Sequence, residues 1–135
     1  MDLKKISRLL YQLKLANQEM TSIFEKETGI SLTRYELMLF LKDHGPCCQI
    51  DLQNALSIDS AAVTRHLKVL EDQGYVTRER NQDNKREVFV QITERAQQAM
   101  GECQTKVESL NPSFNIPLDE IEEEQLFFLL TKLIK

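Results

Sequence analysis

Residues 59–73 carry side chains that could read the edges of nucleic-acid bases. If this segment is a helix, Val63, Leu67 and Leu70 have the spacing of a buried face. The other face carries small, hydroxyl-bearing and basic side chains: Ser60, Ala61, Thr64, Arg65 and Lys68. Small residues allow close approach, arginine can donate two hydrogen bonds to guanine, and lysine can neutralise phosphate. The pattern predicts a helix that lies in the major groove of double-stranded DNA.

A second group of basic side chains follows in a segment typical of a β-hairpin. Residues 75–80 are β-prone, residues 88–92 give a strong strand signal, and the polar residues 81–85 favour a turn. The segment carries four basic side chains, Arg78, Arg80, Lys85 and Arg86. A thin basic hairpin can follow the phosphate backbone or place an arginine in a narrow minor groove. Alone, either feature is better explained as a solvated surface, so the prediction of DNA binding depends on their combination.

The elements before this helix complete an arrangement that could position it. Thr33 and Glu36 have capping-box spacing and predict a helix that ends at Gly45. A short helix over residues 48–56 follows, and Asp59 is a natural N-cap for the next helix. A short helix, a tight turn and an amphipathic helix form the order of a helix-turn-helix, and the hairpin after it is the position of a wing.

Both ends of the chain are expected to be helical and more apolar than one buried face requires. Residues 3–27 place apolar side chains close to heptad spacing, with further leucines off that seam. Thr93 can cap a helix over about 94–110, while Asp119 and Glu122 open a last helix whose LFFLL segment is apolar all round. Such a surface would be exposed on a small monomer, which predicts burial between subunits.

These elements predict a mainly α fold with a small β-hairpin, a winged helix-turn-helix with N- and C-terminal dimerisation helices. We expect an N-terminal dimerisation helix in residues 1–30, the DNA-binding domain in 31–95, and C-terminal dimerisation helices in 96–135. The net charge of −4 counts against nucleic-acid binding, but residues 119–124 (DEIEEE) hold five acids. Because these acids are local, an acidic chain can still present a basic face.

Two stretches of sequence carry a family resemblance. They are LTRYELMLFL and VTRHLKVLEDQGYVTRE, the second followed by the wing segment NKREVFVQIT. Over residues 30–96 the chain resembles the MarR family of multiple-antibiotic-resistance regulators. Asn84, beside Asp83, stands where the family has an acid that orients the wing arginine, and Ser57 and Ala96 stand where the family often has glycine. The resemblance implies a winged helix-turn-helix.

The same resemblance implies a homodimer, held by the first and the last two helices, that binds a pseudo-palindromic operator. It also implies a protein without catalytic activity that is usually a repressor and is released from DNA by a small ligand or an oxidant. The residues leave one alternative open, a winged-helix protein-interaction module without DNA binding. The acidic balance of the chain and the missing wing acid favour that alternative.

Adjacent cysteines lie where the short third helix is expected to begin. The positive end of that helix would lower the pKa of the Cys48 thiol, which predicts an oxidant- or electrophile-sensitive switch, together with Cys47. The alternative is that both are small packed residues. An apolar effector pocket is a further prediction, with core packing as its alternative, and its candidate residues are Tyr11, Tyr35, Met38 and Phe40.

Several classes of protein are not expected. The chain has no recognisable catalytic set or phosphate loop, and His44 and His66 lack the spacing of a zinc motif, so we predict no enzyme activity, no metal and no cofactor. Three cysteines, an odd number, argue against a disulfide framework. No apolar run approaches the ~18 residues of a membrane span, and the N-terminus is unlike a signal peptide. The expected location is therefore the cytoplasm.

Overall fold

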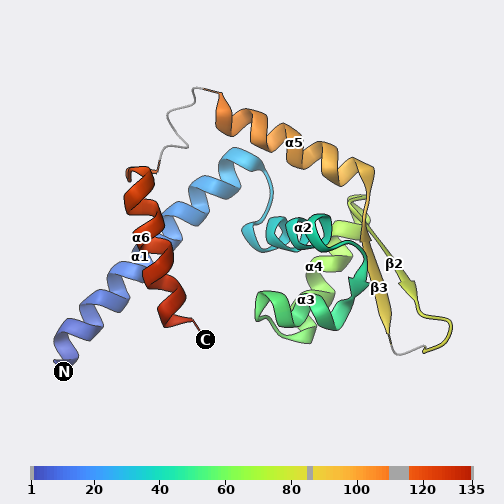
Figure 1. The fold of residues 1–135 in the computed structure, drawn as a ribbon, viewed down its shortest axis with the longest axis horizontal. Helices are drawn as coiled ribbons and strands as arrows, with labels where there is room; N and C mark the ends of the chain where they lie inside the picture. Colours follow the sequence, from blue (N-terminus) through green and yellow to red (C-terminus); the bar gives the residue numbers. More distant parts are fainter. Residues whose placement is uncertain (1, 85–86, 110–115, 135) are drawn as a thin grey trace.

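A computed structural model describes residues 2–84, 87–109 and 116–134. Within these ranges the elements follow in the order α1 (Leu3–Thr28), α2 (Leu32–His44), β1 (Cys47–Cys48), α3 (Gln49–Leu56), α4 (Ser60–Asp72), β2 (Val76–Arg80), β3 (Val88–Ile92), α5 (Glu94–Glu108) and α6 (Glu120–Leu133). Figure 1 shows α2, α3 and α4 beside the sheet, α1 and α6 crossing on the opposite side, and α5 extending between them. The order confirms the predicted winged helix-turn-helix with flanking helices.

The sheet is antiparallel and has the strand order β1-β3-β2. Val90 of the central strand β3 lies between Cys47 of β1 and Arg78 of β2. The β2–β3 hairpin was expected from the sequence, whereas β1 was not. A strand of two residues is too short to show the alternation that marks a strand in a sequence.

One hydrophobic core joins the helices of the winged domain to the sheet and to the start of α5. Its fully or almost fully buried side chains are Leu37, Met38, Leu41, Leu52, Val63, Leu67, Leu70, Val76, Val90, Ala96 and Met100. The α4 members of this core are the three residues whose spacing predicted a buried face. Burial of these side chains holds the opposite face of α4 toward solvent, because residues three and four apart share one face of a helix.

The helix caps follow local side-chain chemistry, with one correction. Asp59, Thr93 and Asp119 cap α4, α5 and α6 as predicted. The cap of α2 is Ser31 rather than Thr33, and its hydroxyl accepts from the Arg34 amide. The carboxylate of Glu25 in α1 accepts from the Leu32 amide at 2.9 Å, so contacts from the preceding helix fix an earlier start.

Helices α1 and α6 contain no buried residue in the single chain. Leucines of both helices line a groove of about 610 Å³, among them Leu9, Leu13 and Leu130. Phe127 is 74% exposed and Leu3 is 78% exposed. The expected excess of apolar surface at the two ends of the chain is therefore present. None of the described helices is both long and apolar enough to cross a membrane.

Candidate nucleic-acid interface

The exposed face of α4 presents the side chains that the sequence singled out. Ser60, Ala61, Thr64, Arg65 and Lys68 are all exposed, and the buried stripe of α4 lies on the other side of the helix. The Asp59 carboxylate accepts from the Ala62 amide at 2.7 Å and fixes the first turn. The helix therefore combines small residues at its N-terminal end with arginine and lysine one and two turns later, an order that permits close approach to a groove.

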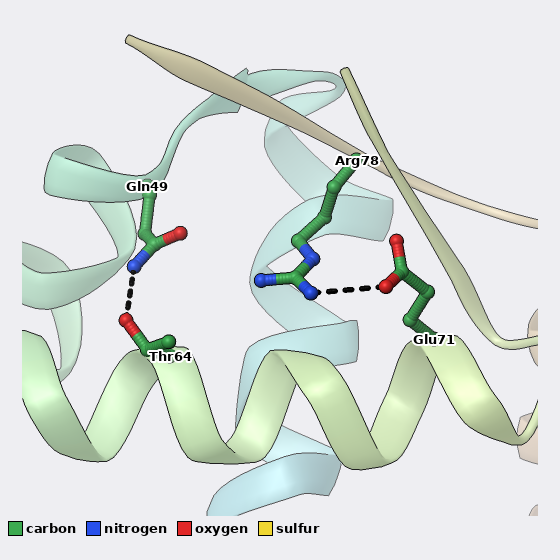
Figure 2. A network of polar contacts seen from close by, with 4 residues as sticks. All are labelled: Gln49, Thr64, Glu71 and Arg78. Carbon is green, nitrogen blue, oxygen red and sulfur yellow. Dashed lines mark hydrogen bonds and ion pairs between the residues drawn. The ribbon is translucent and has the colours of Figure 1, made fainter. Parts of the chain in front are cut away.

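A hydrogen-bond chain connects α4 to the first residue of α3. The Gln49 amide nitrogen donates to the Thr64 hydroxyl at 2.8 Å (Figure 2). That hydroxyl donates in turn to the Ser60 carbonyl at 2.9 Å. The two helices of the helix-turn-helix are thus joined on their exposed side as well as through the core. Sequence reasoning missed this contact, because a glutamine and a threonine that far apart form no local pattern.

A second polar contact connects α4 to the wing. Arg78 of β2 donates to the carboxylate of Glu71 at 2.9 Å (Figure 2). The Arg78 hydrogen bond lowers the pKa of Glu71, against the opposing effect of burial. Sequence reasoning placed Arg78 among the DNA contacts. In the structure one end of its guanidinium is held by α4, so the contact fixes β2 against that helix.

A third contact reaches α4 from α2. An Arg34 guanidinium nitrogen lies 3.4 Å from Nδ1 of His66, and the His66 ring is half-buried. Burial and the nearby charges of Arg34 and Arg65 lower the pKa of His66, which favours the neutral ring at neutral pH. The first turn of α2 therefore contributes positive charge beside α4. No feature of the sequence marks this pairing.

At the wing, polar contacts join the two ends of the loop between β2 and β3. The Asn81 amide donates to the Glu87 carboxylate at 3.1 Å, and backbone hydrogen bonds join Asn81 to Glu87 and Glu87 to Asn84. Arg80 is exposed at the end of β2. The predicted contacts Lys85 and Arg86 lie outside the described residues. The described part of the wing thus places Arg80 at its exposed end.

The cysteines require a correction. Sequence analysis predicted a lowered pKa for Cys48, but partial burial, Glu87 and Asp51 raise it. The Cys48 thiol donates to the Glu87 carboxylate across 3.9 Å, and Asp51 accepts from the Cys48 amide. Burial and the same acid, Asp51, raise the pKa of Cys47 to about 11. The positive helix end is offset by carboxylates, which favour the protonated thiol.

In the described part of the chain, the four residues named for an effector pocket have different surroundings. Met38 is fully buried in the core, and the Tyr35 ring packs edge-on against Phe24. Phe40 stacks on His44, while Tyr11 is exposed on α1. An apolar cavity of about 330 Å³ lies nearby instead, and its lining includes Met20, Phe24, Leu32 and Ile116. Within the described residues, no three His, Cys, Asp or Glu side chains gather to hold a metal ion.

Comparison with known proteins agrees with this geometry. The model of the MarR family matches residues 30–88. The HTH-type transcriptional regulator YdgJ of Bacillus subtilis is 42% identical over 92 residues, which is 68% of this chain. The match spans 56% of the length of YdgJ, so little more than half of that relative is represented.

Solved structures match over almost the full chain. A mutant MarR from E. coli, complexed with operator DNA, has a TM-score of 0.83 at 24% identity, with 100% of both chains covered. Reduced AbfR bound to DNA has a TM-score of 0.79 at 26% identity, covering 98% of this chain and 96% of that one. The first of these shows the fold alone, and it extends the agreement to the terminal helices. With the family match on the winged domain and the YdgJ relative, the chain belongs to the MarR family.

Proposed function

We propose that this protein is a sequence-specific DNA-binding transcription regulator, a repressor that acts as a homodimer on a pseudo-palindromic operator. The observation that carries the proposal is the exposed face of α4, where Thr64, Arg65 and Lys68 lie opposite a fully buried stripe. Contacts from α3 and β2 hold this helix in place. A helix that is held in place, with small residues at its N-terminus and arginine and lysine on its exposed face, suits the major groove.

The roles of the side chains differ within this proposal. Arg65 reads a guanine edge, Ser60, Ala61 and Thr64 approach the bases, and Lys68 contacts phosphate. Arg80 and the wing residues Lys85 and Arg86 contact the DNA backbone. Arg78 acts mainly through its ion pair with Glu71, which fixes the angle between wing and helix.

The uneven distribution of charge removes an objection to this proposal. Acidic side chains gather in the first turn of α6, at Glu120, Glu122 and Glu123. Figure 1 shows that α6 lies on the opposite side of the molecule from α4 and the wing. The net charge of −4 therefore does not describe the face that would meet DNA. Electrostatic attraction to phosphate depends on local charge within about 10 Å at moderate ionic strength.

The terminal helices support a homodimer. The apolar side chains along α1 and α6 would be buried if a second copy packed its own α1 and α6 against them. Two copies related by a two-fold axis would present two α4 helices, which must match half-sites about one helical turn apart. Release from DNA by a small ligand or by thiol oxidation is part of the proposal. AbfR, which has been solved bound to DNA in reduced and overoxidized forms, supports a redox version.

Binding to a randomised double-stranded DNA library tests the proposal. Wild-type protein should select an inverted repeat, and its affinity should fall steeply with salt, because phosphate contacts release counterions. Arg65→Ala should lose roughly 1–3 kcal/mol of discrimination at one base pair of each half-site. Lys68→Ala should weaken binding to all sequences and reduce the salt slope by about one.

The control for these variants is Lys26→Ala, which removes a positive charge at the end of α1, away from α4. It should bind the selected sequence like the wild type. A wild-type protein that selects no sequence and shows no salt-dependent binding would overturn the proposal. That result would favour the alternative, a winged-helix module that binds another protein.

A further inference from the structure

The Thr64 hydroxyl is already engaged by the protein, and this limits what it can do at a base edge. A hydroxyl group has one proton to donate and two lone pairs. The Thr64 hydroxyl donates its proton to the Ser60 carbonyl at 2.9 Å and accepts from Gln49 at 2.8 Å. While both contacts persist, Thr64 cannot donate a hydrogen bond to a purine nitrogen or a carbonyl oxygen of a base.

The methyl group of Thr64 remains available. Figure 2 shows the hydroxyl oxygen turned toward Gln49 and the methyl carbon on the other branch of the side chain, turned away from it. Thr64 lies on the exposed face of α4, so its methyl branch is not covered by the core. In the major groove the apolar group that a side-chain methyl can contact is the 5-methyl of thymine.

We infer that Thr64 recognises a thymine through its methyl group, and that Gln49 is the positioning residue that turns this methyl group, rather than the hydroxyl, toward the base. The inference rests on the proposed DNA binding through α4. Gln49 acts through Thr64, because its amide nitrogen holds the hydroxyl and so fixes the rotation of the threonine side chain. Without Gln49 the hydroxyl would be held only by the backbone of its own helix.

The position of Gln49 makes it suited to this role. It is the first residue of α3 and is half-buried, and the preceding residue, Cys48, is held by the Asp51 carboxylate at the start of the same helix. The side chain therefore extends from a fixed backbone position toward α4. A fixed donor orients Thr64 with less loss of side-chain freedom on binding than a mobile one would.

Replacement of single thymines by deoxyuridine tests the inference, because the change removes only the 5-methyl group. The probe is the sequence that wild-type protein selects from a randomised library. Wild-type affinity should fall about four-fold at one thymine of each half-site, as expected for one buried methyl or methylene group. Deoxyuridine at the other thymines should have a smaller effect.

Two substitutions at position 64 separate the methyl from the hydroxyl. Thr64→Val has a methyl on both branches of a side chain that is stiff in a helix, so one methyl faces the base without any hydroxyl contact, and the sensitivity to deoxyuridine should remain. Thr64→Ser keeps the hydroxyl and should lose that sensitivity at the same base pair. The smaller effects of deoxyuridine at the other thymines should not change. Gln49→Met, which has similar length but no hydrogen-bond donor, should reduce the preference for thymine there, with the melting temperature close to that of the wild type.

The possible results separate this inference from the proposed function. If wild-type protein selects a sequence but no thymine is sensitive to deoxyuridine, the assignment to thymine is wrong and DNA binding stands. If Thr64→Val loses the preference as Thr64→Ser does, the hydroxyl reads the base, by accepting from adenine or cytosine, and the inference is overturned. If wild-type protein selects no sequence, both the inference and the proposed function fail.

Discussion

The winged domain and the terminal helices differ in how far their apolar side chains are buried. Between Leu37 and Met100, eleven hydrophobic side chains form one buried core. Helices α1 and α6 are at least as rich in leucine and phenylalanine as the winged domain is. Neither helix contains a buried residue in the single chain. The winged domain can therefore stabilise itself, whereas the terminal helices need a second surface.

This difference separates recognition from assembly. The residues proposed to contact DNA are fixed by a core that is complete within one chain, and by two polar contacts on α4. The spacing between two such sites would be set by helices whose packing depends on the other subunit. An effector that changes the terminal helices could alter DNA binding without changing α4 itself.

Truncation of a core leucine should produce the largest effect on folding. Leu67→Ala removes a fully buried side chain of α4 and should lower the free energy of unfolding by about 2–5 kcal/mol. Urea unfolding at fixed protein concentration measures the change. Val69→Ala lies on the same helix at a side chain that is 36% exposed, and should change stability by less than about 1 kcal/mol. Equal losses in the two variants would contradict a self-contained core.

A charge on α6 should instead affect assembly. Phe127 is 74% exposed in the single chain, so Phe127→Asp should leave the winged domain folded. If a partner covers this side chain, self-association should weaken by about 30- to 1,000-fold, the range for a buried anchor worth 2–4 kcal/mol. Sedimentation equilibrium measures the change, with Glu124→Gln on the same helix as the control. If wild-type protein is monomeric at micromolar concentration, the expectation that the terminal helices pack against a second copy is wrong.

The thiol of Cys48 offers a smaller test inside the winged domain. Because Glu87 helps to raise its pKa, Cys48 should alkylate slowly at pH 7 and faster as pH rises. In a Cys47→Ser, Cys103→Ser background, Glu87→Gln should speed alkylation at pH 8 by roughly two- to ten-fold, since removing a negative charge favours thiolate. Glu79→Gln, on β2, is the matched control. Rapid alkylation of the wild-type thiol at pH 7 would instead support the reactive switch predicted from the sequence.

The contact between α4 and the wing should have the smallest effect. Arg78 lowers the pKa of Glu71, so the ion pair stabilises the fold above the usual glutamate pKa of about 4.3. This stabilisation is lost as pH falls through the lower pKa of the folded state. Glu71→Gln should cost less than about 1 kcal/mol at pH 7, because both side chains are partly exposed. Urea unfolding at pH 7 and pH 3 should show the difference from wild type shrinking at the lower pH.

Local features of the fold could be predicted from the sequence. The caps at Asp59, Thr93 and Asp119 depend on residues within one turn of the helix that they begin. The buried stripe of α4 follows from spacing alone. Ser31 and Thr33 could both cap α2, and the choice between them depends on Glu25, which belongs to another helix. Local sequence patterns do not contain that information.

The missed features of the candidate site are contacts between distant segments. Gln49 lies near Thr64, and Arg34 near His66, only because α3 and α2 pack against α4. The pKa of Cys48 was predicted in the wrong direction for the same reason. The helix end is visible in the sequence, but the burial of the thiol and the opposing carboxylate of Glu87, which directly precedes the paired strand β3, come from the tertiary fold.

The two-residue strand β1 also has a consequence for the order of folding. Its pairing of Cys47 with Val90 and Cys48 with Phe89 closes a chain segment that contains α3, α4 and β2. Those elements must condense before so short a strand can pair, because two residues contribute little to offset the entropy of closing the loop. We therefore expect β1 to pair late in folding and to separate early in unfolding. The adjacent thiols make that step measurable, since the protection of Cys47 against a thiol reagent reports when the last strand of the sheet has closed.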